Sequence, residues 1–97
     1  MYALAIVRYR RPLEEVLVHQ DAHRAYQREL KRQGLLIAAG PLDPRFGGAQ
    51  LLRVPDEAPL AALDRIRDND PFVLAGVVQY EVLPWKPVLG ADDLDRL

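Results

Sequence analysis

Four apolar runs in the chain have the composition of strands, and two other segments repeat their apolar positions every three or four residues. A period of two is typical of strands, and a period near 3.6 is typical of helices. The predicted strands cover residues 2–9, 35–39, 50–54 and 77–83. The predicted helices cover residues 12–34 and a shorter segment from Asp56 to the turn at residues 68–71.

The long helix begins at Pro12, a residue that suits the first helical position, and ends at Gly34, a residue typical of helix C-termini. Residues 18–21 allow a kink or a restart, because Val18 is β-branched and Asp21 can cap a second segment. One face of this helix carries Val16, His19, His23, Tyr26 and Leu30. Docking on a sheet requires only apolar side chains, so two imidazoles and a phenol make this face the first candidate for chemistry.

Turn residues separate the other elements. Gly40–Pro41 is expected to end the second strand, and Gly47–Gly48 is expected to form the tip of a hairpin. Asp56 is expected to cap the second helix, whose apolar face is predicted at the positions Leu60, Leu63 and Ile66. One more helical turn is predicted from Pro71 to Ala75, and the tail from Pro84 is expected to be irregular or a short amphipathic turn.

The resulting order, β-α-β-β-α-β, predicts an α+β fold of ferredoxin-like type, an antiparallel sheet with both helices on one face. The first strand is apolar on both sides, so we expect it to be central. The sheet face without helices carries leucine and valine side chains and needs a cover. A second copy of the chain is the economical cover, so we predict a homodimer that pairs sheet to sheet.

Composition narrows the function. The chain has 97 residues and is expected to form a single domain over residues 1–97, with a core at about 2–87 and a tail at 88–97. A net charge of −1 without a basic block argues against nucleic acid as a partner, and no apolar run is long enough to cross a membrane. Its first residues resemble a strand rather than a signal peptide, so the cytoplasm is the expected location. Cysteine, serine and threonine are all absent, which excludes nucleophilic catalysis through these residues.

His23 and Asp70 are the candidate catalytic residues. Imidazole is suited to general acid–base work near neutral pH, although a semi-buried structural histidine is an equally good interpretation. Asp70 precedes Pro71, an arrangement that starts a helical turn, and its second carboxylate oxygen is free to orient His23. His19 and His23 have the spacing of zinc ligands, but no further ligand motif accompanies them, so no metal is predicted.

Further candidates are weaker. Tyr26 shares the His23 face, with a core aromatic as the alternative interpretation, and Arg8 would hold a small anion at the end of the first strand unless it is simply solvated. Gly40 and Pro41 would place backbone groups at the rim of a pocket, and Phe72 follows the Asp70 cap. These five residues are predicted to contact a small-molecule ligand.

The chain resembles the YciI-like (YCII-related) family of small bacterial proteins over residues 2–87. The motifs that carry the resemblance are His23–Tyr26 with Leu30 and Gly34, residues 36–42, Asp70–Phe72 with Gly76, and residues 80–82. This resemblance implies a dimeric α+β barrel, related in fold to muconolactone isomerase, with an active site made of a helix histidine and the aspartate of an Asp-Pro-Phe/Tyr motif, here His23 and Asp70. Family members often have a basic residue or a proline just before the histidine segment, where this chain has residues Gln20–Ala22, so no role is carried over there.

The leading hypothesis is a small-molecule enzyme of lyase or isomerase type. His23 would transfer a proton on a cyclic or aromatic-derived substrate, Asp70 would orient it, and no cofactor would be needed. The alternatives are a dimer that binds or senses a small ligand without turnover, and a structural dimer whose polar residues only fix packing. Haem binding, which occurs on related dimeric barrels, has no specific support in these residues.

Overall fold

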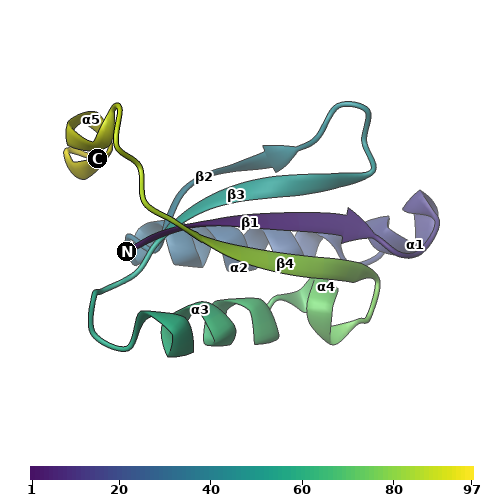
Figure 1. Cartoon of the computed structure of the whole chain (residues 1–97). Helices are drawn as coiled ribbons and strands as arrows, with labels where there is room; N and C mark the ends of the chain where they lie inside the picture. Colours follow the sequence, from purple (N-terminus) through teal and green to yellow (C-terminus); the bar gives the residue numbers. More distant parts are fainter.

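The computed structural model describes residues 1–97, and its elements follow the predicted order (Figure 1). The strands are β1 (Tyr2–Tyr9), β2 (Leu36–Pro41), β3 (Gly47–Arg53) and β4 (Val78–Trp85). The helices are α1 (Leu13–Leu17), α2 (Gln20–Arg32), α3 (Pro59–Asp68), α4 (Pro71–Leu74) and α5 (Ala91–Asp95). All neighbouring strands pair antiparallel in the order β2-β3-β1-β4. This is the predicted α+β ferredoxin-like arrangement, with β1 in the interior of the sheet.

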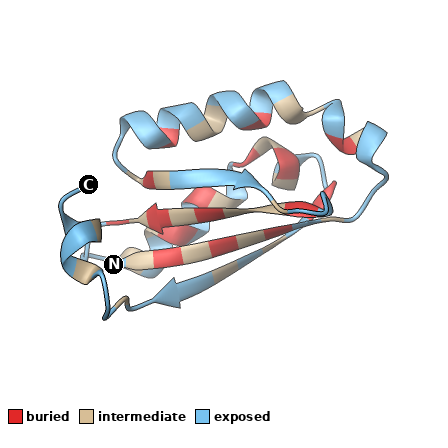
Figure 2. Cartoon of the chain, turned by 90° about the horizontal axis from the view of Figure 1, so that it is seen from above, coloured by how far each residue is buried: buried red, intermediate tan, exposed pale blue.

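The main core lies between the sheet and the two longer helices, α2 and α3, which lie on the same side of the sheet (Figure 1). Along β1, Ala3, Ala5 and Val7 are buried, whereas the residues between them are only partly buried, and this alternation is visible in Figure 2. The side chains that meet them are Leu30 and Leu36 with Leu52, Val54, Leu63 and Ile66. The opposite face of the sheet has no helix comparable to α2 or α3 over it, and we call it the open face.

The predicted long helix consists of two helices that meet at residues 18–19. His19 occupies the N-cap position of α2 with φ −104° and ψ 5°, and no side chain caps this end, so the expected cap by Asp21 is wrong. At the other end Gly34 has φ +78°, its N–H bonds to Lys31, and the N–H of Leu35 bonds to Leu30. These two bonds form a Schellman motif, which explains why glycine ends this helix.

The predicted boundaries of β2 and β3 are wrong, because both strands run further toward each other. β2 continues past Ala39, the predicted end of the strand, and its last residue, Pro41, pairs with Gly48, which is possible because β2 lies at the edge of the sheet. Gly47 and Gly48 are strand residues rather than a loop tip, and Gly47 pairs with Arg8 of β1. A Cβ atom at Gly47 would lie 1.8 Å from the carbonyl oxygen of Val7, so this close pairing requires glycine.

The start of the second long helix also differs from the prediction. Ala58 is the N-cap residue of α3, and Asp56 instead accepts a hydrogen bond of 2.8 Å from the N-terminal ammonium group. Leu63 and Ile66 are buried as expected, but Leu60 is 59% exposed and does not belong to the apolar face. β4 continues past Pro84 to Trp85 at the other edge of the sheet, and the tail forms the short helix α5.

Candidate active site

His23 and Asp70 meet although 47 positions separate them in the sequence. The ring nitrogen Nδ1 of His23, on α2, lies 2.8 Å from Oδ1 of Asp70, which precedes α4. Both residues are buried, with exposed fractions of 9% and 1%. A carboxylate only accepts hydrogen bonds, so Nδ1 is the donor, and Nε2 is left as the ring nitrogen that can exchange a proton.

Local structure holds Asp70 in position. It is the N-cap residue of α4 with extended backbone angles, and its Oδ1 also accepts from the backbone N–H of Phe72 at 2.9 Å. Pro71 follows at the first helical position, where its fixed φ angle favours the turn. The predicted cap is therefore confirmed. One detail of the prediction is wrong, because a single carboxylate oxygen receives both hydrogen bonds.

The imidazole ring of His23 is also held by stacking. Its centroid lies 3.9 Å from that of Phe72, and the two rings are inclined by only 9°. Tyr9 contacts the same phenyl ring edge-on at a centroid distance of 6.4 Å. Phe72 in turn belongs to a buried cluster with Val7 and Val16. Stacking on Phe72 thus fixes the plane of the His23 ring, and the hydrogen bond to Asp70 fixes which ring nitrogen faces the carboxylate.

His23 lines a cavity of about 220 Å³ between α2, the hairpin of β2 and β3, and Phe72. The other lining residues that bear on its chemistry are Gly40, Pro41, Gln50, Tyr9, Arg24 and Arg45. No Asp or Glu side chain lines it, so its fixed charges are the two guanidinium groups. Such a cavity attracts a ligand that carries or develops negative charge.

The model of the YCII-related domain matches residues 1–86 of the chain. The chain belongs to this family. Among solved structures, this YCII-related protein is similar to 5-chloro-2-hydroxyhydroquinone dehydrochlorinase (TftG) from Burkholderia phenoliruptrix AC1100, in complex with 2,5-dihydroxybenzoquinone. The TM-score is 0.73 at 25% sequence identity, and the match covers 92% of this chain and 97% of the other. No curated protein matches the sequence.

Two of the residues expected at the site lie elsewhere in the YCII-related protein. Tyr26 does not line the cavity, and its hydroxyl donates to the carbonyl of Ile66 at 2.8 Å. Burial, and then the charge of Asp70, raise the pKa of Tyr26. Arg8 follows the buried Val7 in β1 and therefore points to the open face, where its guanidinium lies 3.4 Å from Glu81. The structure therefore brings together His23, Asp70, Gly40, Pro41 and Phe72, but neither Tyr26 nor Arg8.

Sequence reasoning missed Gln50 together with the two cavity arginines, Arg24 and Arg45. Gln50 is 3% exposed, and neither Nε2 nor Oε1 of its amide has a hydrogen-bond partner. An unpaired buried polar group costs roughly 1–3 kcal/mol, so its presence calls for a reason. The sequence contained a signal for Gln50, because this polar residue shares one face of β3 with the apolar Leu52, two positions later.

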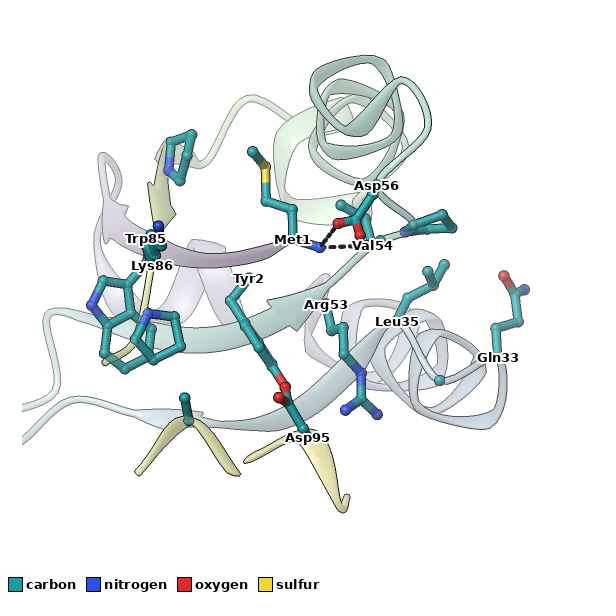
Figure 3. A pocket seen from close by; sticks show the side chains of 15 residues that line it. Met1, Tyr2, Gln33, Leu35, Arg53, Val54, Asp56, Trp85, Lys86 and Asp95 are labelled. Atoms are coloured by element: carbon teal, nitrogen blue, oxygen red, sulfur yellow. Dashed lines mark hydrogen bonds and ion pairs between the residues drawn. The ribbon is translucent and has the colours of Figure 1, made fainter. Parts of the chain in front are cut away.

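A larger hollow of about 860 Å³ lies at the other end of the sheet (Figure 3). Several of its polar groups already pair with one another or with the backbone. The ammonium group of Met1 bonds to Asp56, the hydroxyl of Tyr2 bonds to Asp95, and the guanidinium of Arg53 bonds to backbone oxygens. The hollow also lacks a histidine, so its composition offers no acid–base pair comparable to that of the smaller cavity.

Two further properties bear on what the protein binds. No group of three or more His, Cys, Asp or Glu side chains is arranged to hold a metal ion. None of the helices combines the length and the apolar character that crossing a bilayer requires.

Proposed function

We propose that this YCII-related protein is a small-molecule enzyme of lyase or isomerase type that transfers a proton on a cyclic or aromatic-derived substrate. His23 acts as the general base and acid, and Asp70 orients it. The observation that carries the proposal is the 2.8 Å hydrogen bond between their side chains at the wall of a cavity. The reaction needs no organic cofactor.

The chemistry follows from the arrangement of the pair. His23 donates through Nδ1 to Asp70, so Nε2 of the neutral ring has a lone pair that can take a proton from the substrate. The ring then becomes an imidazolium ion, and the buried carboxylate of Asp70 stabilises that positive charge. Return of the proton to a different atom gives isomerisation, and loss of a leaving group from the deprotonated substrate gives elimination.

The similar solved structure supports the substrate class. TftG is named as a dehydrochlorinase of a chlorinated hydroxyhydroquinone, and dehydrochlorination removes a proton and a chloride ion from one molecule. The cavity beside His23 has a suitable size, because a cavity of about 150 Å³ binds benzene and this one measures about 220 Å³. We therefore propose hydroxylated or chlorinated single-ring compounds as substrates.

The test compares the two histidines of the chain. His23→Ala and His19→Ala are assayed with chlorinated hydroquinones, hydroxylated aromatics and lactones, and circular dichroism verifies that each variant is folded. General-base catalysis contributes roughly 10²- to 10⁴-fold, so His23→Ala should lose at least about 100-fold in turnover while His19→Ala retains it. A folded His23→Ala variant with normal turnover refutes the catalytic role, and ligand binding without product in the wild type favours a binding or sensing protein.

We also propose that two copies pair through the open face. Leu4, Leu51 and Leu83 stand side by side on it, in register across β3, β1 and β4, and Leu83 is 41% exposed. Replacing Leu4 with lysine would place a charge in the middle of the proposed interface. We expect light scattering to give the mass of a dimer for the wild type and of a monomer for Leu4→Lys, with Leu60→Lys on the exposed side of α3 as the control. A monomeric wild type at micromolar concentration contradicts the proposal.

A further inference from the structure

The amide of Gln50 lies in the wall of the cavity that His23 also lines. The side chain is 3% exposed and lines the cavity, yet neither its nitrogen nor its oxygen has a partner within the protein. The two other buried polar side chains, His23 and Asp70, are bonded to each other. Buried polar groups in folded proteins are almost always paired, so an unpaired amide that faces a cavity points to a ligand.

A second unpaired group lies behind this amide. The hydroxyl of Tyr80 is buried without a partner and does not line the cavity. In the sheet register Tyr80 pairs with Val7 and Gln50 pairs with Ala5, so the two polar side chains flank β1 on the helix-covered face. Burial, followed by the charge of Asp70, raises the pKa of Tyr80, and the neighbouring side chain of Gln50 lowers it by less, so the hydroxyl stays protonated as a donor.

We propose that Gln50 binds the substrate oxygen on which negative charge develops when His23 removes a proton. On binding, the hydroxyl of Tyr80 donates to Oε1 of Gln50, a contact that the free protein lacks, and Nε2 is thereby turned toward the cavity as a donor. Tyr80 is thus a positioning residue, and Gln50 is the residue that contacts the substrate. This inference rests on the proposed function and adds to it the group that stabilises the oxyanion.

The step is balanced without a further reactant. Nε2 of His23 takes a proton from a saturated ring carbon next to a carbonyl group, as in the keto tautomer of a hydroxylated ring, and the electron pair of that C–H bond moves onto the carbonyl oxygen. The resulting enolate oxygen accepts a hydrogen bond from Nε2 of Gln50. The electron pair on the enolate oxygen then moves back into the ring. It either takes the proton from His23 at another carbon or expels a chloride ion from the neighbouring carbon. The inferred substrate class is therefore a hydroxylated ring whose keto tautomer has a saturated carbon next to the carbonyl group, such as a chlorinated hydroxyhydroquinone.

The guanidinium groups of Arg24 and Arg45 agree with an anionic ligand. Both line the same cavity, and neither has a carboxylate partner, since Arg45 donates to the amide of Gln20 at 3.0 Å and Arg24 takes part in no ion pair. Together with Gln50 they provide only donors to an oxygen-rich ring. A ligand without oxygen substituents would leave the amide of Gln50 unpaired and would therefore bind poorly.

The experiment replaces Gln50 with methionine, which has a similar size but no amide. The probes are 2,5-dihydroxybenzoquinone for binding, measured by calorimetry, and 5-chloro-2-hydroxyhydroquinone for turnover. Gln50→Met should weaken binding at least 10-fold and lower turnover by roughly 10²- to 10³-fold, the usual effect of losing an oxyanion donor. Its melting temperature is measured to verify that the variant is folded. Gln33→Met, at the exposed end of α2, is the control and should match the wild type.

Tyr80→Phe provides a second variant that keeps the amide. It should weaken binding less than Gln50→Met does, because Nε2 remains but is no longer held, and wild-type affinity in Tyr80→Phe overturns the positioning role. A Gln50→Met variant with wild-type binding and turnover overturns the assignment of Gln50, whether its melting temperature rises or falls. Failure of the wild type to bind the quinone also overturns it. If His23→Ala keeps full turnover while Gln50→Met loses binding, the proposed catalysis fails and the binding role of Gln50 is supported.

Discussion

Replacing Asp70 with alanine removes two hydrogen bonds at once. Its Oδ1 accepts from the backbone N–H of Phe72 at 2.9 Å and from Nδ1 of His23 at 2.8 Å. Loss of an N-cap typically costs roughly 0.5–2 kcal/mol, and a buried N–H left without an acceptor costs roughly 1–3 kcal/mol. We therefore expect Asp70→Ala to lower the free energy of unfolding by roughly 2–5 kcal/mol, a large part of the roughly 5–15 kcal/mol of a small domain.

Asp70→Asn separates the structural role of this residue from its charge. The Phe72 N–H selects the oxygen of the new amide at the cap, and the same oxygen also faces Nδ1 of His23. Both hydrogen bonds survive, so this variant should lose no more than about 1 kcal/mol of stability. Its negative charge is gone, however, so an imidazolium ion at His23 is less stabilised and turnover should fall even though the fold is intact.

Chemical denaturation with linear extrapolation measures these differences. A double-mutant cycle with His23→Ala isolates the pair, and groups in direct contact usually couple by roughly 0.5–3 kcal/mol. An Asp70→Ala variant whose free energy of unfolding lies within about 0.5 kcal/mol of the wild type, the range of an ordinary surface substitution, contradicts this expectation. A coupling energy of zero between Asp70 and His23 contradicts it as well.

Three other predictions concern stability. Gly47→Ala should destabilise the protein by roughly 1–3 kcal/mol, because its Cβ would lie 1.8 Å from a backbone oxygen of β1, whereas Gly40→Ala meets no atom within 4 Å and should leave the urea midpoint unchanged. Burial raises the pKa of Tyr80, so the contribution of its protonated hydroxyl to stability is complete below the phenol pKa of the unfolded chain, about 10. This contribution declines as the pH rises above that value. Tyr80→Phe should flatten this alkaline decline in urea midpoints. The hydrogen bond from Arg32 is the main reason that the pKa of Glu29 falls from 4.5 to about 2, so its small contribution is present above pH 4.5 and is lost between pH 4.5 and about 2. Glu29→Gln should remove that part of the acid dependence, and an identical acid profile in the variant contradicts it.

Local sequence signals were sufficient where the structure depends on near neighbours. Gly34 ends α2 through bonds to residues three and five positions earlier, and Asp70 caps α4 through a bond to Phe72, two positions later. Both patterns are complete within a few residues of the chain, so the sequence predicts them well. The apolar run in β1 likewise predicts an interior strand by itself.

Signals that depend on distant partners were misread. The turn residues Pro41 and Gly47 lie within strands because β2 is at the edge of the sheet and because β1 approaches β3 too closely for a side chain. Arg8 was expected at the site, but the face of β1 to which it points is covered by neither α2 nor α3. Alternation along a strand separates two faces without saying which one the helices cover, and only tertiary packing decides that.

Gln50 is a polar residue in a row of buried positions that are otherwise apolar, and this departure from the apolar pattern points to a function. Gln50, Leu52 and Val54 follow one another at every second position, and all three are buried in the structure. A glutamine in such a row contradicts its own pattern, because burying an amide is unfavourable and an apolar residue would fit the core equally well. Sequences depart from local rules mainly at functional sites, and this departure lies in the wall of the cavity that His23 also lines. A polar residue on the helix-covered face of a strand is therefore a better candidate for ligand contact than an exposed one such as Arg8, even though the arginine has the more conspicuous chemistry.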